Sequence, residues 1–538
     1  MVSKFIAYKE NIMIKIKSSD TNGVVFTDEK NAQLMVSDAL YYKLRIDFST
    51  ISKRNYNYFI EGQTPLKEAS AIVNQILKYR FIDPAVGKGV FIKIIVQLID
   101  QLAKYYNRTI ESDWWQNHVI GWDINPELTE YCKNIFGYKA KIINKDFLLE
   151  SENYYADIIF GNPPYIRQEL LDIQYKFELE KNICVEIPGI KISKRSDLYI
   201  YFILKCFAKL NPEGICTLII PNSWMSTKYG EVIRGLLKSN IQLLSIQDSL
   251  NRHFNESINT VIITVLNKNP KPENKIELSV GDEKKEINQY QLDAIKRDWN
   301  GSLFNCPTWL LEEINTNTEL IKLGDTVKIS TGIITGNNKQ YYESKQINGS
   351  FVKALRSPKD YGAIQIEPGK VTSWLKIKNV PYKIKTAPIV WPDLRGGRHF
   401  VGWNRYELPF EHTFYGLTPN NKKIVEWVMI LNSSWVWLMV ELFGRKALGG
   451  GAIRLVKSEL LKLPVPNPEI IEIPKRCRSI MNRPIENWQT ELKQSDRFVL
   501  DQTVFNFLGL EKHLNECVHL LQKLVNMRHH KAGLKQND

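Results

Sequence analysis

Short apolar runs alternate with helical patterns between residues 70 and 267 of the chain. Runs such as Ile158–Phe160, Leu243–Gln247 and Val261–Leu266 predict buried strands. The segments 90–102 and 197–210, which lie between such runs, predict helices. Because strands and helices alternate, we predict a doubly wound α/β domain with a Rossmann-like parallel sheet.

The pattern changes after a turn-rich connector at residues 267–274 and a transition that ends near residue 318. Short predicted strands, many glycines and many tryptophans follow, which indicates a second domain of mixed α+β structure. The predicted parts are an N-terminal extension at 1–55, the α/β domain at 56–300, the second domain at 301–466 and a helical extension at 467–538.

Charge is distributed unevenly along the chain. The full sequence has 72 Lys and Arg against 58 Asp and Glu, a formal charge of +14. Residues 321–466 contain 22 basic and 10 acidic residues, a net charge of 22 − 10 = +12. A localised basic block favours a polyanionic partner such as nucleic acid, and a solvated basic surface is the alternative.

Cysteine use and apolar segments place limits on location. The 7 cysteines form no CxxC pair, so we expect reduced core thiols in a cytoplasmic setting and no metal site. The first 17 residues have no long apolar core, which argues against a signal peptide. The apolar segment Trp427–Phe443 has Asn432, Ser433 and Ser434 in its middle, which favours buried structure over a membrane span.

Polar residues follow the predicted strands where an open α/β sheet binds ligands. Asp83 opens a loop that contains Gly87 and Gly89, and these glycines let a ligand approach the backbone closely. Asp123 ends the next strand and is placed to accept from the hydroxyls of a ribose. Asp146 follows a third strand. Taken singly, each aspartate also fits an exposed loop acid.

The stretch 156–165 carries the most specific candidate chemistry. Its strand stops at Gly161, and Asn162 then offers an amide that both accepts and donates hydrogen bonds. Pro163 and Pro164 stiffen the loop, and Tyr165 supplies a flat ring. These groups suit a planar exocyclic amine and the ring that carries it. The alternative is a plain turn after a strand.

Two further patterns have local interpretations. Thr64 and Pro65 predict a helix start, with Thr64 as the N-cap. In the second domain, glycine-rich loops with basic residues suit contacts to phosphates and base edges. The candidate DNA-binding residues on these loops are Lys339, Arg395, Arg398, Arg445, Lys446 and Arg454.

Residues 56–466 together resemble the S-adenosylmethionine-dependent N6-adenine DNA methyltransferases of the γ arrangement, the TaqI-like and Eco57I-like modification enzymes. The resemblance implies a methyltransferase domain followed by a target-recognition domain. It also implies that the loop of Asp83, Pro84, Ala85, Gly87 and Gly89 binds the cofactor.

The same resemblance implies roles for individual side chains. Thr64 would lie near the methionine moiety, Asp123 with Ile124 would hold the ribose, and Asp146 with Phe147 would hold the adenine of the cofactor. The catalytic set would be Asn162, Pro163, Tyr165 and Phe254, with Asn162 also near the cofactor. Phe147 in the core is the alternative to its contact with the cofactor.

The implied activity is methyl transfer to N6 of an adenine flipped out of duplex DNA. Asn162 and the Pro163 carbonyl would accept from the amine while Tyr165 and Phe254 stack on the base. The expected protein is a prokaryotic, adenine-specific modification enzyme of a type II restriction-modification system. We expect a monomer that binds double-stranded DNA, and a cognate restriction endonuclease that acts independently.

Three other functions fit parts of the pattern. A loop of this kind also suits the methylation of RNA bases or of protein glutamine, although a protein-glutamine enzyme of the release-factor type would not need the basic block at 321–466. A bifunctional enzyme that also cleaves DNA would need a nuclease domain, for which residues 1–55 are short. A DNA-binding protein with an inactive methyltransferase core is disfavoured because the site residues are intact, namely Asp83, Asp123, Asp146 and Asn162.

Overall fold

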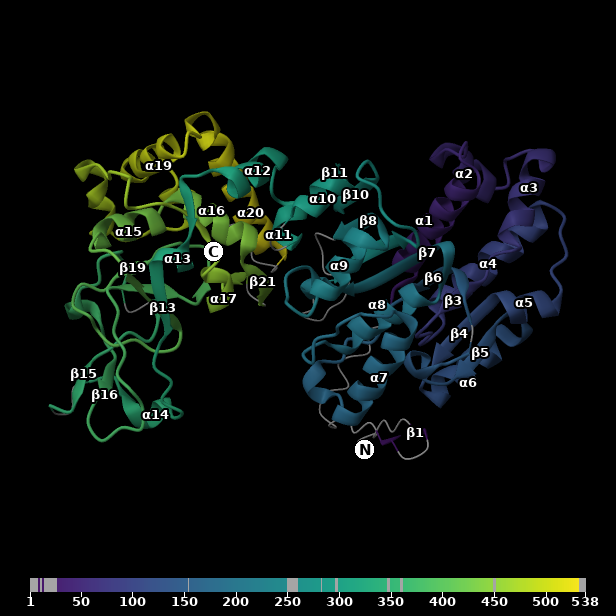
Figure 1. The fold of residues 1–538 in the computed structure, drawn as a ribbon, viewed down its shortest axis with the longest axis horizontal. Helices are drawn as coiled ribbons and strands as arrows, with labels where there is room; N and C mark the ends of the chain where they lie inside the picture. Colours follow the sequence, from purple (N-terminus) through teal and green to yellow (C-terminus); the bar gives the residue numbers. More distant parts are fainter. Residues whose placement is uncertain are drawn as a thin grey trace. The chain divides into compact units, whose positions relative to one another are not determined.

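Two units with separate cores make up the chain, residues 1–299 and 300–538 (Figure 1). A computed structural model gives the fold. It describes residues 8–9, 12–13, 27–152, 154–248, 260–281, 283–295, 299–345, 349–358, 361–448 and 451–531.

The first unit is built on a sheet of 9 strands in the order β11-β10-β8-β9-β7-β6-β3-β4-β5. Strands β5, β4, β3, β6 and β7 run parallel, β9 runs antiparallel to both β7 and β8, and β11 runs antiparallel to β10. The strands are β3 (Phe81–Asp83), β4 (Val119–Asp123), β5 (Lys141–Asn144), β6 (Ala156–Gly161), β7 (Leu210–Pro221), β8 (Gln242–Asp248), β9 (Thr260–Leu266), β10 (Lys275–Val280) and β11 (Glu283–Asn288).

The order of these strands reverses beside β3. The chain passes from β3 to β4 and β5 on one side, then returns to β6 and β7 on the other. In open α/β sheets this reversal opens a crevice at the carboxyl ends of the two central strands. The ends of β3 and β6, at Asp83 and Gly161, therefore lie where a ligand is expected.

Helices cover both faces of this sheet. Ile158, Phe160 and Ile215 share an apolar core with α1 and α4, and α1 packs against β6, β7 and α4. On the opposite face, Cys216 of β7 contacts Cys206 of α8. The helices are α1 (Glu29–Asp47), α2 (Lys53–Ile60), α3 (Leu66–Ile76), α4 (Val90–Tyr105), α5 (Ser112–His118), α6 (Pro126–Phe136), α7 (Ile173–Glu186), α8 (Leu198–Ala208), α9 (Glu231–Ser239) and α10 (Gln289–Ala294).

The predicted doubly wound α/β architecture is confirmed, with two local differences. Helix α3 begins at Leu66 and its N-cap is Pro65, so Thr64 does not cap it. The polar stretch 166–196, for which no element was predicted, contains α7, whose residues Tyr175, Leu179 and Ile183 are buried. Three apolar side chains at helical spacing were sufficient to form a packed helix within that stretch.

The second unit combines small antiparallel sheets with helices. Its largest sheet has the order β13-β20-β17-β19, and a three-stranded sheet has the order β18-β22-β21. The strands of these sheets are β13 (Val327–Thr331), β17 (Ile389–Pro392), β18 (Leu394–Arg395), β19 (Gly402–Trp403), β20 (Phe414–Pro419), β21 (Arg445–Leu448) and β22 (Ala452–Arg454). Another three-stranded sheet has the order β14 (Tyr342–Glu343), β16 (Trp374–Lys376), β15 (Phe351–Lys353). Two-stranded sheets are formed by β12 (Leu320–Lys322) with β23 (Pro464–Pro466) and, in the first unit, by β1 (Tyr8–Lys9) with β2 (Ile12–Met13).

Two apolar helices lie at the centre of the second unit. Helices α15 (Ile424–Leu431) and α16 (Ser434–Phe443) meet at an angle of 56°, and Trp427, Trp435 and Leu438 are buried in the core. Over the part of the chain that the structure describes, no single helix is long and apolar enough to cross a membrane, although this bent pair together meets that criterion. The burial of both helices agrees with the prediction for this segment.

The C-terminal helices belong to the same core. They are α19 (Ser495–Phe507) and α20 (Leu514–Lys531), and the other helices of this unit include α12 (Thr308–Thr316), α14 (Asn338–Tyr341), α17 (Lys457–Leu460) and α18 (Trp488–Glu491). Leu500, Val504, Leu521 and Leu524 are buried in one cluster with residues of α15 and α16.

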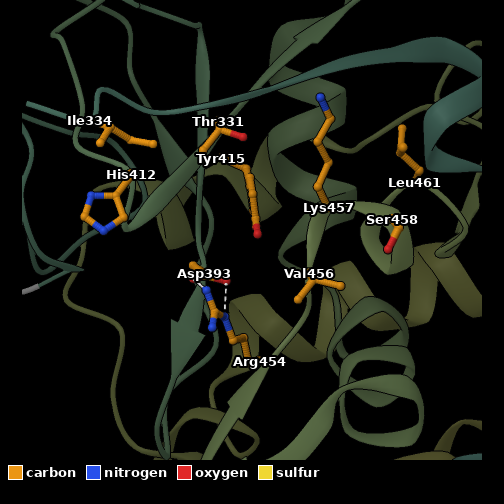
Figure 2. Close-up of a pocket in the computed structure, with 10 residues that line it drawn as sticks. All are labelled: Thr331, Ile334, Asp393, His412, Tyr415, Arg454, Val456, Lys457, Ser458 and Leu461. Carbon is orange, nitrogen blue, oxygen red and sulfur yellow. Dashed lines mark hydrogen bonds and ion pairs between the residues drawn. The ribbon is translucent and has the colours of Figure 1, made fainter. Parts of the chain in front are cut away.

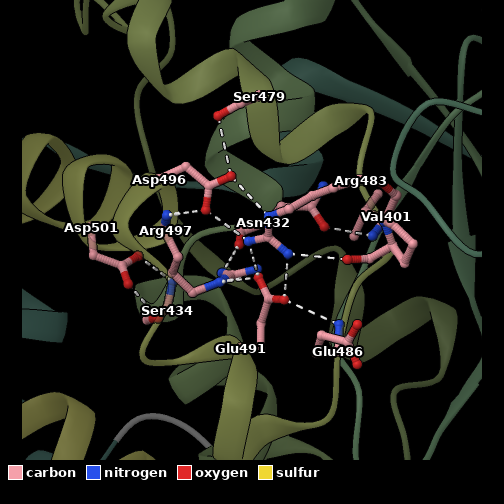
Figure 3. Close-up of polar contacts among 11 residues, drawn as sticks. Val401, Asn432, Ser434, Ser479, Arg483, Glu486, Glu491, Asp496, Arg497 and Asp501 are labelled. Carbon is pink, nitrogen blue, oxygen red and sulfur yellow. Dashed lines mark hydrogen bonds and ion pairs between the residues drawn. The ribbon is translucent and has the colours of Figure 1, made fainter.

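Buried ion pairs and hydrogen bonds hold the C-terminal helices in this core, and Figure 3 shows those around Arg497. Arg497 and Glu491 are both fully buried, with Arg497 Nε 2.8 Å from Glu491 Oε1, and Arg497 also donates to the Asn432 carbonyl between α15 and α16. Arg528 of α20 forms a second buried pair with Glu441 of α16, at 2.8 Å. Because an unpaired buried charge is costly, each arginine fixes its helix in place.

Candidate active site

The glycine loop between β3 and α4 is locked to the end of β4. Gly87 and Gly89 have φ angles of 52° and 78°, in the left-handed region that favours glycine. The Gly87 amide donates to Asp123 Oδ2 at 2.9 Å, and the Val86 amide donates to the Trp122 carbonyl at 2.7 Å. The loop therefore presents its backbone at the edge where β3 and β4 end.

Asp83 lies fully buried at the carboxyl end of β3. Its Oδ1 accepts from the Ala85 amide at 3.1 Å, whereas Oδ2 has no hydrogen-bond partner among the described residues. Burial, and then the nearby charge of Asp123, raise the pKa of Asp83 to about 8. Buried polar atoms are normally hydrogen-bonded. An unpartnered polar atom where the strand order reverses therefore indicates a place for a ligand donor.

Asp123 is half-buried at the end of β4 and already accepts from two backbone amides. Oδ1 accepts from the Asn125 amide at 2.8 Å and Oδ2 from Gly87. Burial raises the pKa of Asp123, while these amides act in the opposite direction. An ionised carboxylate has about four acceptor sites, so it can also accept from a diol. The adjacent Ile124 is 44% exposed and offers an apolar surface beside the carboxylate.

Asp146 and Phe147, which follow β5, occupy different environments. Asp146 Oδ2 accepts from the Tyr175 hydroxyl of α7 at 2.8 Å. Phe147 is 3% exposed, and its ring packs between Trp122 and Phe202, with centroids 5.5 and 6.3 Å away. The structure therefore puts Asp146 at the edge but puts the Phe147 ring in the core, so the ring is not displayed to a cofactor.

Asn162 follows β6 directly, opposite the glycine loop. A Cβ atom on Gly161 would lie 3.1 Å from Pro84 Cδ, so the ends of β3 and β6 touch at this point. The Tyr165 hydroxyl donates to Asn162 Oδ1 at 2.5 Å, and its oxygen lies 3.1 Å from the Ile219 carbonyl. Tyr165 is 7% exposed, so little of its ring is open to solvent. Its hydroxyl instead orients the Asn162 side chain.

The structure therefore brings together the predicted residues of the loop after β3, of β4 and of the stretch 156–165. It does not bring Thr64 to this edge. Thr64 hydrogen-bonds Tyr106, which follows the far end of α4, and a helix of 16 residues places that end about 24 Å from Gly89. The prediction for Phe254 lies outside the described residues.

Another helix start reaches the carboxyl edge instead, and it was not predicted. Asp28 caps α1 by accepting from the Asn31 amide at 2.9 Å, and Glu29 pairs with Lys93 in the first turn of α4 at 2.9 Å. Thr27 Oγ1, next to this cap, is buried without a hydrogen-bond partner among the described residues. Asp28 followed by apolar Ala32, Met35 and Val36 is an N-cap signal that could have revealed it.

The basic residues of the second unit divide into two groups. Lys339, Arg398, Arg445 and Arg454 are exposed, as a contact with DNA requires, whereas the Lys446 side chain lies outside the described residues. Arg395 is 6% exposed, lies 3.7 Å over the Trp391 ring and contacts His399 Nδ1 at 3.0 Å. The prediction that Arg395 binds DNA is wrong, because its guanidinium is packed in the core and burial lowers its pKa to about 9.

Comparison with known proteins agrees with this arrangement. Residues 90–254 match the family model of the Eco57I restriction-modification methylase. The Type II methyltransferase M.XhoI of Xanthomonas vasicola is 22% identical over 61% of this chain and 71% of its own length. The Type II methyltransferase M.AccI of Acinetobacter calcoaceticus is 23% identical, and the match covers 55% of each chain, so this chain spans about half of that relative.

A solved structure supports the fold over nearly the whole chain. The Type IIL restriction-modification enzyme MmeI, in complex with DNA, superposes with a TM-score of 0.59 at 14% identity, covering 93% of this chain and 79% of the other. The resemblance inferred from the sequence motifs is confirmed by the family match and by the type II methyltransferases, while MmeI supports the fold alone. Residues 90–254 are therefore similar to the methylase of the Eco57I restriction-modification enzymes.

Proposed function

We propose that this chain is a site-specific DNA methyltransferase that transfers a methyl group from S-adenosylmethionine to N6 of an adenine in duplex DNA. The observation that carries the proposal is the position of Asn162. Asn162 follows β6 where the strand order reverses, and it lies directly across from the glycine loop that begins at the end of β3. An amide that binds an exocyclic amine and a loop suited to a nucleoside cofactor thus share one edge.

The residues at this edge fit S-adenosylmethionine. Gly87 and Gly89 expose backbone, Asp123 can accept from the ribose hydroxyls, and Ile124 can lie against the adenine ring. The start of α1 replaces Thr64 in our proposal, because the backbone N–H groups of a helix N-terminus favour a carboxylate such as that of the methionine moiety. When bound, the cofactor supplies an electrophilic methyl group on a sulfonium.

Asn162 and its neighbours act on the target amine. Asn162 Oδ1 and the Pro163 carbonyl accept hydrogen bonds from N6, which keeps the nitrogen lone pair directed toward the methyl group. The Tyr165 hydroxyl fixes the rotamer of the Asn162 amide and thus which of its ends faces the amine. The target base must leave the duplex to reach these groups. The contribution of the protein is therefore positioning and electrostatics.

Duplex DNA is the proposed substrate because the second unit carries the surplus of positive charge. Residues 321–466 have 22 basic against 10 acidic residues, and Lys339, Arg398, Arg445 and Arg454 are exposed. Exposed lysines and arginines neutralise phosphates, and this supplies most of the sequence-independent affinity for DNA. Methylation of protein glutamine would not use this block.

The proposal is tested by incubating the full chain with labelled S-adenosylmethionine and with duplex DNA, RNA or protein in parallel. We expect label in duplex DNA, recovered as N6-methyladenine after digestion to nucleosides. Asn162→Ala is the matched control, and it should bind the cofactor in calorimetry without transferring the label. Transfer to RNA or protein with none to duplex DNA would contradict the proposal, as would methylated cytosine in place of adenine.

A further inference from the structure

A cavity of about 520 Å³ opens in the second unit between β13, β20 and the segment that follows β22 (Figure 2). Its lining includes Thr331 at the end of β13, Ile334 from the loop that follows, His412 just before β20, Tyr415 within β20, and Lys457. The volume lies in the range of about 300–1,000 Å³ that is usual for ligand pockets. The methyl-transfer residues all belong to the first unit, so the cavity has a separate role.

Asp393 and Arg454 form the polar centre of this cavity (Figure 2). Arg454 Nε donates to Asp393 Oδ1 at 2.9 Å and Nη2 donates to Oδ2 at 2.6 Å, which is a bidentate pair. The Tyr415 hydroxyl also hydrogen-bonds Asp393. Burial and the negative charge of Asp393 raise the pKa of Tyr415. The Asp393 amide donates to the Thr413 carbonyl at 2.9 Å. The backbone amide therefore anchors Asp393, and two side chains hold its carboxylate.

The pair leaves one edge of the guanidinium available. Asp393 takes the side formed by Nε and Nη2, and Nη1 has no hydrogen bond to another described residue. An arginine held in this way presents the N–H groups of Nη1 and Nη2 side by side, in a plane that the carboxylate fixes. The Arg454 side chain is 44% exposed, whereas that of Asp393 is 12% exposed. The fixed edge therefore faces solvent while its anchor is covered.

A planar pair of donors matches one base edge in DNA better than any other. In the major groove, guanine presents the acceptors O6 and N7 at the spacing of an arginine fork. We propose that this cavity takes the major-groove edge of a guanine in the recognition sequence, with Arg454 reading the base and Asp393 as its positioning residue. The inference rests on the proposed function, since it takes duplex DNA as the substrate.

The walls of the cavity fit this ligand. Ile334 is 66% exposed, and an apolar side chain at the rim can pack against a neighbouring base or thymine methyl. His412, whose side chain is 52% exposed, and the exposed Lys457 can lie along the backbone of the DNA. A contact of Arg454 with a phosphate is the competing possibility, and it predicts a different result below.

The test begins with the recognition motif of the wild-type chain, obtained by modification-sensitive sequencing of DNA from a host that expresses it. Each guanine of that motif is then replaced in turn by 7-deazaguanine in synthetic duplexes, which removes the N7 acceptor. We expect one guanine at which kcat/KM falls by about 5- to 150-fold, the range of a bidentate base contact. In Arg454→Lys, which keeps the charge and loses the fork, that position should become insensitive to the replacement.

Two further variants separate positioning from folding. Asp393→Asn keeps the shape of the anchor and should weaken the discrimination at the same guanine only. Arg478→Lys is the matched control, because Arg478 is an exposed arginine of the second unit that lies outside residues 321–466 and does not line the cavity. The motif of Arg478→Lys should be that of the wild type.

Several results would overturn the inference. A motif without guanine, or equal losses by Arg454→Lys at every position together with a shallower salt dependence, would show a phosphate contact or none. A wild-type chain that leaves duplex DNA unmethylated would contradict the proposed function as well. A methylating wild type whose motif is unchanged by Arg454→Lys would contradict only the reading of guanine.

Discussion

Gly89→Ala should damage both the stability of the first unit and its affinity for the cofactor. Gly89 has a φ of 78°, and a left-handed conformation costs a residue with a Cβ about 1–2 kcal/mol. The new Cβ would lie 2.6 Å from Phe136 Cε2 and 2.8 Å from its Cζ, and overpacking against a buried ring costs about 1–3 kcal/mol. The sum is a loss of about 2–5 kcal/mol in the free energy of unfolding.

The place of the clash makes this change functional. The last residue of α6, Phe136, packs against the glycine loop, so the new Cβ forces a shift of the ring or of the loop beside the point where Asp123 holds Gly87. We therefore expect weaker cofactor binding as well as lower stability. Urea unfolding followed by circular dichroism gives the first quantity, and calorimetry with S-adenosylmethionine gives the second.

Gly509→Ala is the matched control for the cost of placing a residue with a Cβ in the left-handed conformation. Gly509 has a φ of 70°, but nothing lies within 4 Å of the Cβ it would gain. We expect a loss of only about 1–2 kcal/mol from the second unit and unchanged cofactor affinity. Equal losses in the two variants, or a Gly89→Ala chain within about 0.5 kcal/mol of wild type, the range of an uneventful surface substitution, would refute the predicted clash with Phe136.

Three other changes probe the same edge. Asn162→Ala should lower kcat about 10²- to 10³-fold in a methyl-transfer assay and leave cofactor affinity unchanged, because it removes one acceptor of the target amine. Tyr165→Phe keeps the ring but loses the hydroxyl that orients Asn162, so kcat should fall about 2- to 12-fold with little change in KM. Asp83→Asn should remove a pH dependence of stability. The folded state holds this proton up to about pH 8, whereas an unfolded aspartate releases it near 3.9, so the wild-type free energy of unfolding should fall between about pH 4 and pH 8.

These predictions have clear contrary outcomes. A folded Asn162→Ala chain with near-normal methyl transfer would contradict the assigned chemistry. Tyr165→Phe with wild-type kcat would restrict the role of Tyr165 to its ring. Equal changes in urea midpoint for wild type and Asp83→Asn between pH 5 and pH 8 would show that Asp83 is ionised in the folded chain.

The sequence was sufficient for the sheet and for the ends of its strands. Asp83, Asp123 and Asn162 each follow an apolar run, and parallel strands bring such positions to one edge regardless of the loops between them. Thr64 was misplaced because a helix-start signal is local. Such a signal shows that a helix begins and does not show at which edge of a sheet it begins.

Burial was the other property that the pattern did not reveal. Arg395 carries the same charge as Arg398, yet Trp391 and His399 enclose the first and leave the second in solvent. The two aromatic residues, four positions away on either side, were the available signal, since Arg is the cation that most often stacks on aromatic rings. The same limit applies to the apolar Phe147, which is buried. An aromatic side chain next to a site residue suits the core as well as it suits contact with a ligand.

The buried arginines of the C-terminal helices limit how specificity can be exchanged between relatives. A chimaera that received only residues 301–466 would keep Glu441 and Asn432 but take Arg528 and Arg497, which bind them, from a foreign tail. A buried pair that loses one member costs about 3–5 kcal/mol, a large part of the stability of a typical domain. The transplantable unit is therefore residues 300–531, and libraries of new specificities should carry the tail with the recognition loops.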